Sequence, residues 1–233
     1  MIADQSGVSA ILLFGSRARD DNSRGSDTDL LLIAPPSVPR HKSIGHLSMF
    51  FYPWEKLVED ARAGDLFVCH IVREAKPVFD PLQQLDQLRS SFRLRTSYAR
   101  EIAHARELGW LLDRHAGAFN SQIVLRRMIW CVRTILIARL AERGTPQFAP
   151  TALAEIAPEP VAELLADRHQ RRLDVSMRHR FRQFMISEGG QPPLLGDGTL
   201  DDFRTLFIQT DNQVGLQTLQ SGMSSLEEGE YYR

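Results

Sequence analysis

Apolar and polar positions change their period along the chain, from strand-like near the N-terminus to helix-like beyond about residue 81. Successive side chains in the strand-like part alternate between two faces or form short apolar runs, as buried β-strands do. These segments are 8–14 (VSAILLF), 30–33 (LLLI) and 46–52 (HLSMFFY), with a short fourth strand at 77–80. Gly15 and Pro35-Pro36 interrupt the pattern and indicate turns.

Helical periodicity between and after these runs completes the expected order of elements. Helices are predicted over 54–63, 66–75, 85–115, 122–143, 151–157, 160–173 and 175–188, with a last one from about Thr199. The pattern predicts an α/β (α+β) protein with two domains. Residues 1–80 form a compact α/β unit and residues 81–233 an all-helical bundle, with the boundary near Asp80-Pro81.

Composition and charge argue against several classes of protein but do not point to one function. A formal net charge of -1 gives no whole-chain attraction to nucleic acid or to an anionic membrane. The two cysteines, Cys69 and Cys131, lie in apolar segments and are expected to be reduced core residues. The first residues have no signal-peptide pattern, and no apolar run approaches the roughly 20 residues that a bilayer requires. These features predict a cytoplasmic protein without a membrane partner.

Candidate chemistry lies where the second strand begins. Asp27 and Asp29 are two residues apart, so on a strand both carboxylates point to one face, about 7 Å apart. Two ionised carboxylates that close repel each other unless a cation lies between them. Oxygen donors of this kind suit Mg²⁺ or Mn²⁺. The spacing therefore predicts a divalent-metal site.

A Gly-Ser turn precedes this pair. Gly15 and Ser16 follow the first strand directly, and a glycine there lets backbone N–H groups approach a phosphate closely. A phosphate clamp beside a metal site is the arrangement of phosphoryl or nucleotidyl transfer.

The combined pattern, Leu13-Phe14-Gly15-Ser16, a ten-residue spacer and Asp27-Thr28-Asp29-Leu30, resembles the signature of the DNA polymerase β-like nucleotidyltransferase superfamily. It is most similar to small prokaryotic members, the minimal and the aminoglycoside nucleotidyltransferases. The resemblance covers roughly residues 8–80 and implies a small mixed sheet with flanking helices. It also implies roles for individual residues: Asp27 and Asp29 as catalytic metal ligands, and Gly15, Ser16, Arg17, Arg19 and Ser26 at the nucleotide.

The implied reaction transfers a nucleoside monophosphate from an NTP, with ATP expected, to an acceptor hydroxyl, and releases pyrophosphate. The acceptor is left open among a protein, an RNA and an aminoglycoside. The arginines between Arg168 and Arg182 could bind RNA or the acidic face of a partner, but a solvated basic helix pair is the preferred explanation.

One departure from the family motivates an alternative. A third carboxylate is expected on the neighbouring strand, yet HLSMFFY contains none, and Ser48 or Phe50 occupies its position. The acids that could replace it are Glu55, Glu59, Asp65 and Asp80. The alternative is therefore a catalytically impaired, antitoxin-like nucleotide-binding or regulatory protein, which would use the helical domain to form a homodimer or to bind a partner protein.

Overall fold

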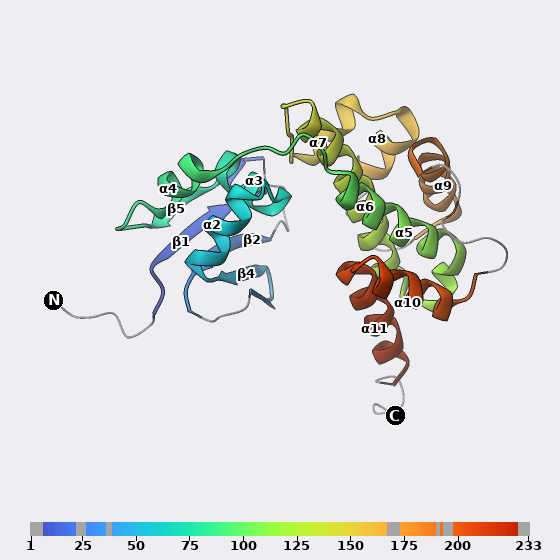
Figure 1. The fold of residues 1–233 in the computed structure, drawn as a ribbon. Helices are drawn as coiled ribbons and strands as arrows, with labels where there is room; N and C mark the ends of the chain where they lie inside the picture. Colours follow the sequence, from blue (N-terminus) through green and yellow to red (C-terminus); the bar gives the residue numbers. More distant parts are fainter. Residues whose placement is uncertain are drawn as a thin grey trace. The chain divides into compact units, whose positions relative to one another are not determined.

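The structure is a computed structural model that describes residues 7–21, 27–35, 39–166, 173–189, 192 and 198–227. The chain separates into two compact units, 1–96 and 97–233 (Figure 1), and each unit is described by itself.

The first unit is built on a five-stranded mixed sheet. Its strands are β1 (Ala10–Phe14), β2 (Thr28–Ile33), β3 (Arg40–Ile44), β4 (Leu47–Tyr52) and β5 (Lys76–Phe79). They lie in the order β3-β4-β2-β1-β5. The β2–β4 pair is parallel and the other three pairs are antiparallel. The predicted fold class is thus confirmed, and the sheet contains one strand, β3, that the apolar pattern did not indicate.

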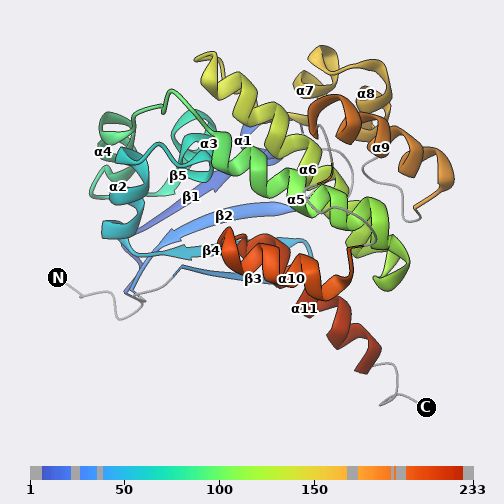
Figure 2. The ribbon, with the colours of Figure 1, turned by 45° about the vertical axis from the view of Figure 1, so that its right-hand side comes forward.

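Helices pack on one face of this sheet. They are α2 (Trp54–Arg62), α3 (Leu66–Glu74) and α4 (Gln84–Ser91), and a short α1 (Ser16–Arg19) follows β1. These helices lie against the sheet in the ribbon (Figures 1 and 2). The alternating residues of β1 and β2 that face the helices are buried together with helix residues in one core. This core contains Ala10, Leu12, Phe14, Leu31, Ile33, Leu57, Ala61, Val68, Ile71, Val72, Ala75, Leu85 and Leu88.

The second unit is helical, as predicted. It contains α5 (Ala99–His115), η1 (Ala116–Ala118), α6 (Ser121–Glu142), α7 (Pro150–Ile156), α8 (Glu159–Ala166), α9 (Val175–Gly189), α10 (Leu200–Gln209) and α11 (Gln213–Glu227). Its longest helices, α5 and α6, pack on each other, and α9, α10 and α11 contact α5. Across the described ranges, no helix is both long and apolar enough to cross a membrane.

Two helix predictions are wrong in their extent. The segment 85–115 is not one helix, because residues 92–98 separate α4 from α5. The last helix is likewise two, since Asp211 adopts a left-handed conformation (φ 56) between α10 and α11. Of the predicted helix 160–173, residues 167–172 lie outside the described residues, and residue 173 is not helical.

Candidate active site

Strand register brings the candidate residues together at one end of the sheet, where β1 ends and β2 begins. Asp29 is paired with Phe14 of β1 on one side and with Ser48 of β4 on the other. Ser48 in turn is paired with Ser43 of β3. Directly paired residues point to the same face, so these four side chains form one row across the sheet. We call Phe14, Asp29, Ser48 and Ser43 the site row.

The Gly-Ser turn and the second aspartate meet in this row. Gly15 has φ 72 and ψ -155, a combination that essentially only glycine adopts. A Cβ placed on Gly15 would lie 2.6 Å from Oδ2 of Asp29. The turn therefore leaves room for the carboxylate only because residue 15 has no side chain, which links the two halves of the motif physically.

Asp27 lies immediately before β2 and is half-exposed. Its Oδ1 is 3.2 Å from Nδ1 of His46, which follows Gly45 in the turn between β3 and β4. The backbone N–H of Thr28 donates to the carbonyl of His46 at 2.7 Å and fixes this turn beside the start of β2. His46 therefore lies beside Asp27, a neighbour that no sequence signal indicated.

Arg19, which is predicted to lie near the phosphates, makes two ion pairs within the protein. Its guanidinium donates to Glu74 at the end of α3 and, at 3.0 Å, to Asp21. His70 also contacts Glu74, with 2.8 Å between Nε2 and Oε2. Burial alone would raise the pKa of Glu74, but the bonds from His70 and Arg19 outweigh it and hold that pKa below its usual value. This charged cluster attaches α1 to α3.

The other residues predicted to bind nucleotide are placed as follows. Ser16 and Arg17 lie on α1 next to Gly15, and both are partly buried. Ser26 lies outside the described residues.

The expected neighbour of β2 is β4, and it carries no carboxylate. Two of the four candidate acids cap helices instead. Asp65 accepts from the N–H groups of Phe67 and Val68 at the start of α3. Asp80 accepts from the N–H groups of Gln84 and Leu85 at the start of α4.

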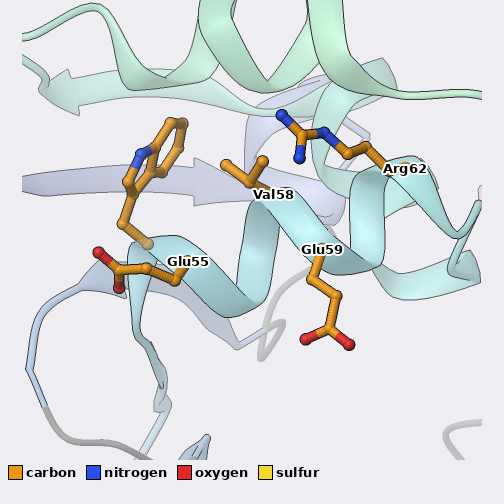
Figure 3. A pocket seen from close by; sticks show the side chains of 5 residues that line it. Glu55, Val58, Glu59 and Arg62 are labelled. Carbon is orange, nitrogen blue, oxygen red and sulfur yellow. The ribbon is translucent and has the colours of Figure 1, made fainter.

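The remaining two acids lie on α2. Glu55 and Glu59 line a surface hollow with Trp54, Val58 and Arg62, and all five side chains come from α2 (Figure 3). This helix begins after Tyr52, and Tyr52 is about 13 Å along β4 from Ser48 by the rise of a strand. Glu55 lies in the first turn of this helix, beyond that end of β4, and Glu59 contacts Lys56 at 3.2 Å on the same helix.

A hydroxyl–imidazole chain occupies the position of the missing acid. Oγ of Ser48 lies 3.4 Å from Oγ of Ser43, which is 3.2 Å from Nε2 of His41. The His41 ring stacks on Phe50, with centroids 4.4 Å apart and an interplanar angle of 26°. The position next to Asp29 on β4 is thus lined by hydroxyl and imidazole groups rather than by a carboxylate.

The donor set fits a metal ion that arrives with its nucleotide. The described ranges contain no group of three His, Cys, Asp or Glu side chains placed to hold a metal ion by themselves. Asp27 and Asp29 supply two hard carboxylate donors, and the phosphate oxygens of an NTP would supply others. Such an ion would neutralise the charge that develops on the transferred phosphoryl group.

Two of the arginines between Arg168 and Arg182 are engaged in ion pairs within the helical unit. Arg182 lies 3.3 Å from Asp113, and Arg180 pairs with Glu163. Arg168, Arg171 and Arg172 lie outside the described residues.

One comparison with known proteins agrees with the motif, namely that with protein-family models. Residues 2–92 match the family model of the nucleotidyltransferase domain. A solved structure, that of a nucleotidyltransferase-like protein from Exiguobacterium sibiricum 255-15, is similar over 92% of this chain and 84% of that chain, with 17% identity and a TM-score of 0.32. A search among curated proteins found no match. The resemblance predicted from the sequence is thus confirmed for the N-terminal segment, and the match supports nucleotidyl transfer in general rather than the antitoxin-like alternative.

Proposed function

We propose that residues 2–92 bind an NTP, with ATP expected, together with Mg²⁺ or Mn²⁺, and transfer its nucleoside monophosphate to an acceptor hydroxyl with release of pyrophosphate. The observation that carries this proposal is the close approach of Gly15 to Oδ2 of Asp29. It places a turn suited to phosphate directly against a carboxylate suited to metal.

Each residue has a role in this proposal. Asp27 and Asp29 hold the metal ion that accompanies the nucleotide. Backbone N–H groups of the turn at Gly15 and Ser16 contact the phosphates, and Arg17 lies beside them on α1. Ser26, which precedes Asp27 in the chain, contributes a hydroxyl that binds the nucleotide.

Arg19 supports the site indirectly, because its ion pair with Glu74 fixes α1. The acceptor is a protein, an RNA or an aminoglycoside, and the reaction takes place in the cytoplasm.

The test supplies each α-³²P-labelled NTP and Mg²⁺ or Mn²⁺ to the purified chain, with cell lysate as a source of acceptors. We expect label in a macromolecule or a small molecule, with pyrophosphate released in equal amount. Asp29→Asn keeps the size of the side chain but removes the metal-binding charge, so it should lower transfer by at least about 10²-fold. Asp27→Asn should have an effect of the same kind.

Asp86→Asn is the matched control, because it removes an exposed carboxylate from α4 in the same unit. It should leave transfer unchanged. Transfer that is absent for every NTP and both metals, or that survives unchanged in Asp29→Asn, would reject the proposal.

A further inference from the structure

Strand β3 presents a serine–histidine pair to the candidate site. All five residues of β3 are exposed, and the strand forms an edge of the sheet. Its pairing with β4 places Ser43 in the site row, next to Ser48 and one strand further from Asp29. We propose that Ser43 is itself a nucleotidylation site of this chain, with His41 as the group that accepts its proton. This inference rests on the proposed function.

The side chain that would activate Ser43 is held in place. Nε2 of His41 lies 3.2 Å from Oγ of Ser43, within reach of a hydrogen bond from the hydroxyl. The His41 ring stacks on Phe50, and Phe50 packs edge-on against Phe14 at 5.4 Å. A serine hydroxyl is a weak nucleophile until an adjacent base removes its proton, and an oriented imidazole is the commonest such base.

The distance across the sheet suits a phosphate between Asp29 and Ser43. Two strand spacings separate them, which is about 10 Å between their Cα atoms. A metal ion lies about 2 Å beyond the carboxylate oxygen that binds it. A hydroxyl must come within about 3–3.5 Å of the atom that it attacks. The distance that remains is about that of one phosphate group. This phosphate would lie over β4, the strand on which the third carboxylate is absent.

The step balances without a further reactant. Oγ of Ser43 attacks the α-phosphorus of the NTP, and a bond forms between that oxygen and phosphorus. The bond from the α-phosphorus to the oxygen bridging to the β-phosphate breaks, and pyrophosphate leaves with its electron pair. The hydroxyl proton moves to Nε2 of His41.

The experiment omits every other acceptor. The purified full-length chain is incubated with α-³²P-labelled ATP and Mg²⁺, and its intact mass is measured. We expect a gain of one nucleoside monophosphate. Trypsin should place it on the peptide from Ser43 to Lys56, and fragmentation should distinguish Ser43 from Ser48 in that peptide. Because β3 is fixed to its own sheet, the rate per molecule should not change on dilution.

Variants separate the roles. Ser43→Ala should abolish the label, Ser43→Thr should retain it because the hydroxyl remains, and His41→Gln should slow it by about 10²-fold. Ser90→Ala is the matched control and should still be labelled, because it removes the hydroxyl of an exposed serine on α4, outside the site row. Label that persists in Ser43→Ala, or that maps to another residue, would overturn the inference.

Failure of the inference and of the proposed function look different. If the chain alone gains no label but transfers it to lysate acceptors in both wild type and Ser43→Ala, the inference is wrong and the proposed function stands. If neither reaction releases pyrophosphate, both are wrong.

Discussion

At the scale of single residues, the site depends on a glycine that no other residue can replace. In Gly15→Ala the new Cβ would meet Oδ2 of Asp29 at 2.6 Å, in a backbone conformation with φ 72 that strains any side chain. We expect a loss of about 1–3 kcal/mol in the free energy of unfolding and a fall of at least about tenfold in affinity for ATP with Mg²⁺. Urea unfolding and calorimetric titration measure the two effects.

Gly144→Ala is the control for backbone strain alone. Gly144 has φ +79, and nothing lies within 4 Å of its added Cβ. This variant should lose stability without losing nucleotide affinity. Equal nucleotide affinity in the two variants would show that the contact between Gly15 and Asp29 has no part in binding.

Glu74 makes a second prediction at this scale, through pH. Its pKa is lowered in the folded protein, so its ionised form stabilises the fold above the unfolded value of about 4.3. That contribution is lost as the pH falls through the folded pKa. Glu74→Gln should therefore cost about 1–3 kcal/mol near neutral pH, and the difference from wild type should shrink below about pH 4.

Urea unfolding over a pH series tests this prediction. Glu59→Gln, which changes a side chain that is 72% exposed, is the control and should have little effect at any pH. A difference between wild type and Glu74→Gln that stays constant down to about pH 3 would mean that ionisation of Glu74 does not stabilise the fold.

At the scale of elements, the apolar pattern predicted the strands and helices that are rich in apolar residues. It missed strand β3, which forms only through its hydrogen bonds to β4. Strands β1, β2 and β4 and helix α6 are rich in apolar residues and were predicted close to their observed bounds. Strand β3 has no apolar alternation, and its hydrogen bonds to β4 are what make it a strand. Similarly, the N–H of Arg93 donates to the carbonyl of Ala61, a tertiary bond at the break between α4 and α5 that local sequence does not reveal.

The residues of the candidate site likewise fall into those that the sequence predicts and those that it does not. Gly15, Asp27 and Asp29 were predicted because they are close in sequence and form a motif. His46 and Glu74 approach that motif only through the turn between β3 and β4 and the end of α3. Sequence spacing alone cannot identify contacts of this kind, since they depend on which strands and helices become neighbours.

The prediction at the scale of elements concerns the turn between helices α10 and α11. Asn212, fully buried in the turn between these helices, donates to the carbonyl of His104 and to Glu107 on α5. Asn212→Ala would leave these buried acceptors without that donor and cost about 1–3 kcal/mol. We expect faster hydrogen exchange in α10 and α11, with exchange in the first unit unchanged. Gln213→Ala, at an exposed neighbouring position, is the control, and equal exchange in both variants would contradict the prediction.

At the scale of the whole molecule, helix α4 decides where the first folding unit ends. Leu85 and Leu88 of α4 are almost fully buried in the core of the first unit, together with residues of β1, α2 and α3. Arg89 donates to the carbonyls of Val72 and Ala75, both at 3.1 Å. We therefore propose that the nucleotidyltransferase domain includes α4 and the segment up to Thr96, beyond the boundary that the change of period near Asp80 predicts.

Two fragments test this proposal. Residues 1–96 should unfold cooperatively in urea and bind ATP with Mg²⁺, because this unit keeps its whole core. Residues 1–80 lack both leucines of α4, and each fully buried leucine contributes about 1.5–3 kcal/mol. Since a domain is stable by only about 5–15 kcal/mol in total, the shorter fragment should be largely unfolded and should not bind nucleotide. Equal stability of the two fragments would instead mean that α4 is dispensable for the sheet and that the domain ends at Asp80.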